Sequence, residues 1–348
     1  MSSVGCSAPC SAAGSRASPI RLTATPIWAD PTWRAVALAW VDAQLARLGR
    51  RLTGPVEQPH VRPWSTVMRL PTSGGIAWFK AAAPGTAHEA PLLRALAGWG
   101  MPMLLAPLAI DPERAWLLLP DGGTRLRDQL GGAAGVDAWT RILPAYASLQ
   151  RRLTPRAGDL MEVGVPDLRP ARMPERLRAL IDDPDARLGE ADRARLQRIV
   201  PDYVTWCEAL AASGIEPTLQ HDDLHDGNVF VAQGDRFAAE DRIFDWGDAV
   251  VAHPFGTLLA TLRSIASRDA ALGRTDLRRL RDAYLEPWTA EHSRAALNDT
   301  VQTALRVGAV GRALAWQRAL SGVAPAAQGE YAGAVGEWLL ELFEPTVI

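Results

Sequence analysis

Cysteine and long hydrophobic runs are scarce in this sequence of 348 residues, and each absence excludes a class of protein. The three cysteines are Cys6, Cys10 and Cys207. An odd number with this spread fits neither a disulfide framework nor a zinc site. No apolar run reaches the roughly 18 residues that span a bilayer. Residues 1–26 lack the apolar segment of a secretory signal, so we expect a disordered tail and a cytoplasmic location.

The sequence also lacks an excess of either charge. It has 37 Lys and Arg against 39 Asp and Glu, which gives a formal net charge of −2. A nearly neutral chain has no overall field that would attract nucleic acid or an anionic membrane, so we expect neither as a partner. The sequence carries no signal for an oligomeric state. At about 150 residues per domain, the length predicts two domains or lobes.

Lysine is the rarest charged residue, because 36 of the 37 basic side chains are arginine and the single lysine is Lys80. Lysine is a compact charge on a slim stem, whereas arginine is a wide planar fork, so a narrow site accepts only the former. In a chain this rich in arginine the single lysine is either a chance survivor or a requirement. Its surroundings decide between the two.

The region up to residue 121 predicts a small mixed lobe. Apolar residues at three- and four-residue steps predict a helix over Ala29–Arg51. Val61–Ala83 contains two strand-like runs joined by a glycine pair that suits a tight turn, and Lys80 ends the second run. A helix is expected from His88, followed by two more strands within residues 104–120.

Beyond a flexible hinge near residues 119–123, helical periodicity dominates. We therefore expect an α+β protein, with an antiparallel sheet in an N-terminal lobe over 27–121 and a larger, mostly helical lobe over 122–348. Pro155–Arg187 is rich in Pro, Asp and Arg and reads as an irregular surface connection, while residues 228–246 predict a second hairpin. The predicted helices are Ala138–Leu153, Ala191–Ala212, Phe255–Ile265, Leu277–Leu285, Val301–Leu320 and Tyr331–Phe343.

The densest chemical cluster lies at His221–Asp226, where three aspartates and two histidines occur in six residues. Like charges this close raise each other's pKa, and such crowding is typical of sites that use a cation or a proton. Asn228 follows on the same loop, and Asp245 ends the next strand-like run. Amide and carboxylate oxygens brought together in this way are ligands that Mg²⁺ accepts.

The spacing matches a general pattern of phosphoryl transfer. A loop aspartate acts as base, an asparagine five residues later and a strand-end aspartate hold metal, and a lysine contacts the nucleotide phosphates. The two aspartates and the asparagine of this pattern correspond to Asp223, Asp245 and Asn228. Its lysine corresponds to Lys80. Because the pattern assigns the base to aspartate, we expect His221 to brace the loop.

His221–Asn228 (H-x-D-L-H-x-x-N) and Ile243–Asp248 (I-F-D-W-G-D) resemble the aminoglycoside phosphotransferase and choline-kinase-like family. Trp78–Lys80 is similar to the family's strand lysine, and His88–Ala90 to the helix glutamate that pairs with it. Leu117–Asp121 is similar to the hinge that binds adenine. The resemblance implies a two-lobed, protein-kinase-like fold.

The resemblance also implies a reaction: transfer of the γ-phosphoryl group of ATP (or GTP) to a hydroxyl of a small molecule. The acceptor would be aminoglycoside-, choline-, sugar- or amino-alcohol-like. Asp223 would be the catalytic base, and Asn228 and Asp245 would hold Mg²⁺. Lys80 would contact the phosphates, with Glu89 as its partner. A lone lysine is then explained, because a guanidinium fork would not fit between phosphates and a glutamate.

The remaining nucleotide contacts follow from the same resemblance. Leu119 and Asp121 would lie at the adenine-binding hinge. The loop expected to cover the phosphates, Arg62–Thr66, has no glycine. Ser65 and Thr66 are its candidate phosphate donors, through hydroxyl and backbone N–H groups.

Two departures leave alternatives open. Asp222 stands where the family usually has glycine, and it either points outward harmlessly or raises the pKa of the neighbouring base. Together with the glycine-free loop, it motivates a nucleotide-binding pseudokinase without transferase activity. A second alternative is a hydrolase that uses His221, Asp223 and His225 as ligands to zinc. It leaves Lys80 unexplained.

Overall fold

The computed structural model describes residues 27–129, 132–231, 241–269 and 272–348. The predicted tail, with Cys6 and Cys10, lies outside them. The helices are α1 (Pro31–Arg47), α2 (Glu89–Gly98), α3 (Leu126–Gln129), α4 (Gly132–Leu153), α5 (Ala157–Glu162), α6 (Met173–Asp182), α7 (Glu190–Ala211), α8 (Thr257–Arg268), α9 (Arg274–Leu285), α10 (Arg294–Leu320) and α11 (Ala334–Leu340). The strands are β1 (Glu57–Val61), β2 (Ser65–Thr72), β3 (Gly75–Ala82), β4 (Ala109–Asp111), β5 (Trp116–Pro120), β6 (Asp167–Leu168), β7 (Thr218–Gln220), β8 (Val229–Phe230), β9 (Arg242–Ile243) and β10 (Val250–Ala252).

An antiparallel five-stranded sheet in the order β1-β2-β3-β5-β4 forms the N-terminal part of the fold. The predicted hairpin is confirmed: β2 and β3 meet at a turn where Gly75 has a φ of +96°, a conformation that favours glycine. β3 is an inner strand, so Lys80 is paired with Val67 on one side and Leu117 on the other. The backbone of Lys80 is therefore held from both sides.

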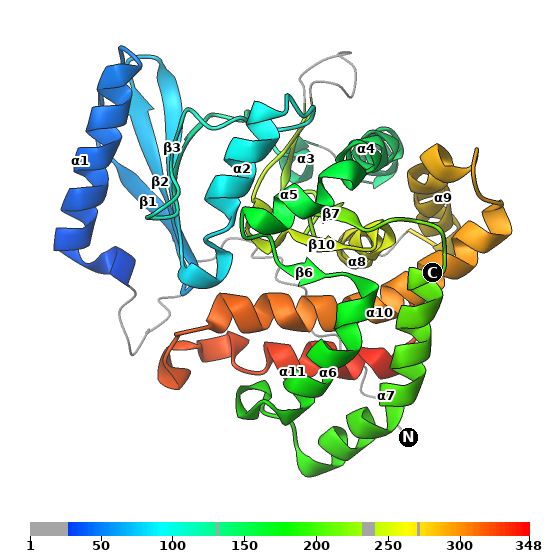
Figure 1. The fold of residues 1–348 in the computed structure, drawn as a ribbon. Helices are drawn as coiled ribbons and strands as arrows, with labels where there is room; N and C mark the ends of the chain where they lie inside the picture. Colours follow the sequence, from blue (N-terminus) through cyan, green and yellow to red (C-terminus); the bar gives the residue numbers. More distant parts are fainter. Residues whose placement is uncertain (1–26, 130–131, 232–240, 270–271) are drawn as a thin grey trace.

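One helix packs on each face of this sheet, α1 on one and α2 on the other (Figure 1). Helix α1 begins where the Asp30 carboxylate accepts a hydrogen bond from the Thr32 N–H at 2.7 Å. Its residues Val41 and Leu45 are buried against Phe79 of the sheet. The apolar face of α2 packs instead into the larger hydrophobic core that continues through the helical part.

The rest of the molecule is mostly helical, as predicted. Its helices start and end within about three residues of the expected positions, with two exceptions at helix starts. Helix α4 begins at Gly132, six residues before the expected Ala138. Helix α10 begins at Arg294, seven residues before the expected Val301, with Ser293 as its N-cap. The predicted helix over Tyr331–Phe343 is broken, and only α11 within it is α-helical. Helices α10 and α11 lie side by side at the base of the molecule (Figure 1). No helix in the described ranges is both long and apolar enough to cross a membrane.

The prediction of an irregular connection over Pro155–Arg187 is wrong. The segment forms α5, β6 and α6, and its leucines, among them Leu160 and Leu177, are fully buried in the main core. Four of the five prolines that suggested a loop lie at the starts of α-helices or 3-10 helices, where the missing N–H costs nothing. Burial of one apolar face outweighs the polar composition of the other.

A polar loop, residues 221–228, connects β7 of a small three-stranded sheet to β8. Strand β8 pairs antiparallel with β9, so the two predicted strands of the second hairpin are confirmed. Residues 232–240, which join them, lie outside the described ranges. Because β9 runs beside β8, the residue that follows it, Asp245, is carried back to the polar loop.

Candidate functional site

Lys80 joins three distant parts of the chain. Its ammonium Nζ lies 2.6 Å from Oε2 of Glu89 on α2 and 2.5 Å from Oδ1 of Asp245 after β9. The Lys80 and Glu89 side chains are 10% and 2% exposed, whereas that of Asp245 is 50% exposed. Burial alone would lower the pKa of Lys80, but the two carboxylates outweigh it and raise this pKa. Lys80 therefore keeps its positive charge beside the half-exposed Asp245 carboxylate.

The two carboxylates that contact Lys80 are themselves held. The second oxygen of Glu89, Oε1, accepts a hydrogen bond from the Trp246 N–H at 2.9 Å. Asp245 has a φ of +63°, a left-handed conformation that turns the chain sharply after β9. Desolvation acts to raise the pKa of Asp245, but the Lys80 ammonium outweighs it and lowers this pKa. Asp245 is thus ionised at neutral pH.

Asp223 and Asn228 contact each other within the polar loop. The Asn228 side-chain amide donates to the Asp223 backbone carbonyl at 3.0 Å and to its carboxylate Oδ2 at 3.4 Å. The Asn228 backbone carbonyl accepts a hydrogen bond from the Phe244 N–H at 3.1 Å, which ties the loop to the strand before Asp245. The sequence-predicted residues Asp223, Asn228 and Asp245 therefore lie together.

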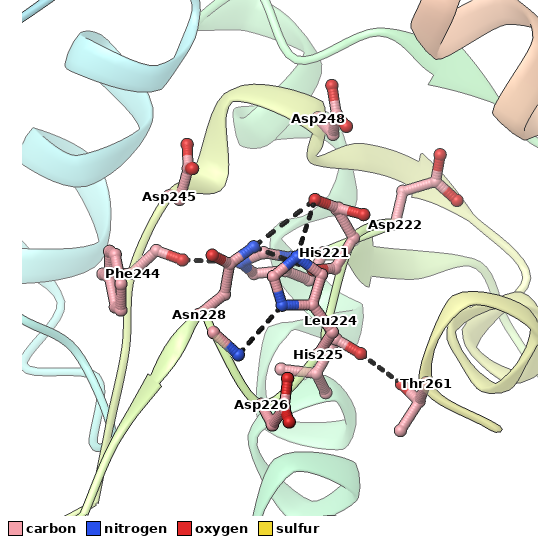
Figure 2. A network of polar contacts seen from close by, with 12 residues as sticks. His221, Asp222, Leu224, His225, Asp226, Asn228, Phe244, Asp245, Asp248 and Thr261 are labelled. Carbon is pink, nitrogen blue, oxygen red and sulfur yellow. Dashed lines mark hydrogen bonds and ion pairs between the residues drawn. The ribbon is translucent and has the colours of Figure 1, made fainter. Parts of the chain in front are cut away.

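Both histidines of the loop are used in its structure. His221 Nε2 lies 2.9 Å from the Phe244 carbonyl oxygen (Figure 2). The His221 backbone N–H donates to the Tyr146 hydroxyl. The expectation that His221 braces the loop is in agreement with these contacts. His225 accepts from the Gly227 N–H through Nδ1, and its Nε2 lies 3.5 Å from Oδ2 of Asp223.

The oxygen donors fit a magnesium ion. The amide nitrogen of Asn228 is used by Asp223, which leaves the amide oxygen as its metal-binding atom. Asp245 gives one oxygen to Lys80 and keeps the other, on a half-exposed side chain. One amide and one carboxylate oxygen are ligands of the kind taken by a cation that retains several waters. The described residues contain no group of three His, Cys, Asp or Glu side chains placed to hold a metal.

Asp222 points into the protein, and its neighbour Arg312 was not found by sequence reasoning. Asp222 is 2% exposed, and burial raises the pKa of its carboxyl to about 6. The Arg312 guanidinium, from α10, lies 3.5 Å from Oδ2 of Asp222, 3.4 Å from Oδ1 of Asp223 and 3.1 Å from Oδ2 of Asp248. The available signal was an arginine inside the apolar run 309–315.

The glycine-free loop reaches the helical part of the molecule. The indole of Trp64 packs edge-on against Trp316 of α10 and Tyr331, with ring centroids 5.5 and 4.9 Å apart. The Thr66 hydroxyl is buried and donates to the His60 carbonyl at 2.8 Å. Its single proton is used inside the sheet, so we remove this hydroxyl from the candidate phosphate donors. Ser65 begins β2, with its hydroxyl 3.3 Å from a ring nitrogen of His60.

The predicted hinge residues lie at the end of β5. Leu119 is paired with Trp78 in the sheet, and the Asp121 carboxylate accepts from the Trp78 indole N–H and from the Gly123 N–H, both at 3.4 Å. A side chain at Gly122 would overlap the ring of Phe230, with the added carbon 2.1 Å from it. This glycine therefore allows the connection to pass closely over β8.

A cavity of about 800 Å³ lies away from these residues. It is bordered by Pro84 and His88 at the start of α2 and by Gln317 and Arg318 at the end of α10. Neither Lys80 nor the acidic residues of the site line it. The convergence of charged side chains, and not the cavity, defines the candidate site.

The family comparison agrees with this geometry. The model of the phosphotransferase enzyme family matches residues 56–256, more than half of the chain. The chain belongs to this family. The matched region begins before β1 and ends after β10, so it includes every residue of the candidate site except Arg312.

Solved structures share the α+β fold of the family. An ethanolamine kinase from Plasmodium vivax is 11% identical with a TM-score of 0.59, covering 89% of each chain. A choline/ethanolamine kinase family protein from Mesorhizobium loti is 17% identical with a TM-score of 0.56, covering 88% of this chain and 95% of that one. A macrolide 2′-phosphotransferase from Brachybacterium faecium is 16% identical with a TM-score of 0.56, covering 86% and 97%. Among curated proteins, none matches this chain.

Proposed function

We propose that this protein transfers the γ-phosphoryl group of ATP or GTP to a hydroxyl of a small molecule. The observation that carries the proposal is the contact of the single lysine with Asp245, beside the loop that presents Asp223 and Asn228. A fixed cation and a set of oxygen ligands then lie close together, as the transfer of a charged phosphoryl group requires.

In this proposal the nucleotide would lie between two lobes, over 27–121 and 122–348, that are hinged near 119–123. Lys80 would contact the phosphates, and Glu89 would hold Lys80 in place. The backbone at Leu119 and Asp121 would bind the base, and Ser65 would donate to the phosphates from the start of β2. Asn228 and Asp245 would hold Mg²⁺, which neutralises charge on the phosphate oxygens when bound.

Asp223 is assigned to the acceptor. Its carboxylate would accept a hydrogen bond from the acceptor hydroxyl, orient the oxygen toward the γ-phosphorus and take the proton as the new P–O bond forms and the bond to the nucleoside diphosphate breaks. Burial acts to raise the pKa of Asp223, but Arg312 and His225 outweigh it and lower this pKa. The carboxylate is thus ionised, and its contribution is mainly orientation.

The test is a screen for ADP release from ATP and Mg²⁺ against a library of hydroxylated small molecules that includes aminoglycosides, choline, sugars and amino alcohols. We expect acceptor-dependent release that falls at least about 100-fold in Asp223→Asn, with unchanged thermal stabilisation by nucleotide. Release that is equally fast in Asp223→Asn would contradict the role of Asp223.

Two other functions have less support. A pseudokinase is motivated by the buried Asp222 and by the glycine-free loop, and would show nucleotide-dependent thermal stabilisation with no ATP consumption for any acceptor. The zinc hydrolase needs His221, Asp223 and His225 as ligands to one metal ion. The contact of His221 Nε2 with the Phe244 carbonyl, at 2.9 Å, is compatible with metal binding through the other ring nitrogen. Among the described residues, however, no group of three His, Cys, Asp or Glu side chains is placed to hold a metal.

A further inference from the structure

Arg312 contacts the polar loop although it is far from it in the sequence. It lies on α10, about 90 residues after the loop, and is only 7% exposed. Its Nη1 donates to the Asp222 backbone carbonyl at 2.7 Å and to the Asp248 carboxylate at 3.1 Å, while Nη2 lies 3.4 Å from Oδ1 of Asp223. One planar guanidinium thus holds the loop and the turn after β9 in a fixed relation.

Asp223 has partners on both carboxylate oxygens. Oδ2 lies 3.4 Å from the Asn228 amide nitrogen and 3.5 Å from His225 Nε2, while Oδ1 faces the Arg312 guanidinium. Contacts on opposite oxygens fix the plane of a carboxylate, which a contact on one oxygen does not. Of these partners, Arg312 alone comes from outside the loop.

Asp222 supplies one of the negative charges that allow an arginine to be buried here. Its φ of +62° is a conformation that favours glycine, so aspartate is retained at a conformational cost. Its Oδ1 accepts from the Gln220 amide at 2.6 Å, and its Oδ2 lies 3.5 Å from Arg312. A buried charge is costly unless it is paired. Arg312 is the cation beside Asp222, and Asp222 is one of three carboxylates, with Asp223 and Asp248, that lie beside Arg312.

We propose that Arg312 is a positioning residue for Asp223, and that Asp222 is one of the counter-charges that keep Arg312 beside the loop. The inference rests on the proposed function, in which Asp223 orients the acceptor hydroxyl. A guanidinium that fixes Oδ1 leaves the carboxylate in one orientation, and small displacements of a reacting group are expensive in rate.

The experiment separates the structural role of Arg312 from its positioning role. Arg312→Met strands the Asp222 carboxyl in the interior, so we expect a large loss of thermal stability. Adding Asp222→Gly removes that acid and supplies the residue that suits the backbone, so the double variant should regain most of the stability. Its kcat should nevertheless stay about 100-fold below that of the unchanged protein, with the KM for ATP within about threefold, because Lys80 and Asp245 are intact.

ADP formation is measured with the best acceptor of the screen, or with water as acceptor if the screen finds none. Arg306→Met is the matched control: Arg306 is exposed on the same helix and packs over Trp206, so this variant should retain full turnover. A double variant that regains turnover together with stability would overturn the positioning role.

The positioning role of Arg312 can be tested even if the proposed function is wrong. If the unchanged protein releases no ADP under any condition, the proposed function fails. A crystal structure of the Arg312→Met, Asp222→Gly variant then decides the inference, because an Asp223 carboxylate in the same orientation overturns it and a rotated one supports it.

Discussion

At the scale of single residues, the structure explains why lysine occurs once. Lys80 is almost fully buried between Glu89 and Asp245, both within 2.6 Å of its nitrogen. A point charge on a slim stem meets both carboxylates from the strand, whereas a planar fork would need a wider space. The composition of the chain and the geometry of the site therefore lead to the same residue.

His88, just before Glu89, gives a prediction of pH dependence. It is buried, with Nε2 3.1 Å from the Ala249 carbonyl oxygen, and burial lowers its pKa from 6.5 to about 4. Below pH 6.5 the unfolded chain takes up a proton that the folded chain does not, so stability falls as the pH drops toward about 4. His88→Gln should remove up to about 3 kcal/mol of this loss.

Urea unfolding of both proteins between pH 4.5 and 7.5 measures the difference. His253, with a pKa lowered to about 3 by burial, and Asp222, with one raised to about 6, titrate in both proteins and cancel in the comparison. Parallel stability curves for the two proteins would show that His88 does not contribute.

At the scale of elements, the turn before α2 packs directly against the end of α10. Gly85, in the turn before α2, is so close to the Arg318 backbone that an added side-chain carbon would lie 1.9 Å from its carbonyl oxygen. A carbonyl oxygen in a helix cannot move aside as a flexible side chain can. The glycine is required by this approach, and not by its φ.

Gly85→Ala should therefore lower the free energy of unfolding by about 1–3 kcal/mol, because two backbones must separate. Gly98→Ala on α2 is the control, since nothing lies within 4 Å of its added carbon. That variant should be as stable as the unchanged protein or slightly more stable, because alanine is the better helix former. Equal effects of the two substitutions in thermal unfolding would contradict the packing argument.

At the scale of the whole molecule, the structure has two hydrophobic cores. One core lies between α1 and the five-stranded sheet, and the other extends from α2 through the helical part. The aromatic contact of Trp64 with Trp316 connects the loop before β2 to α10. The loop before β2 thus has an anchor where the family pattern relies on glycines.

Trp64→Ala should weaken nucleotide binding severalfold, because the loop over the proposed phosphate site loses its anchor; each aromatic pair contributes about 0.5–1.5 kcal/mol. Calorimetric titration with ADP and Mg²⁺ measures this change. Tyr331→Phe keeps the ring against Trp64 and should bind ADP as the unchanged protein does. Unchanged binding by Trp64→Ala would show that the contact serves packing alone.

The sequence by itself determined the features that depend on short spacing. The hairpin before Lys80, the helix that begins with Glu89 and the order Asp223, Asn228, Asp245 follow from local periodicity and from the chemistry of neighbouring residues. Pro155–Arg187 was misread because its composition is polar on average, while the burial of its leucines depends on helices from elsewhere in the chain.

Only the tertiary structure decided the surroundings of these residues. Whether Asp222 points outward or inward depends on Arg312, which lies about 90 residues away, and the fate of the Thr66 hydroxyl depends on the neighbouring strand. A buried charge is stable or unstable according to its partner across the fold. Local sequence carries no record of that partner, because the two meet only when the chain has packed.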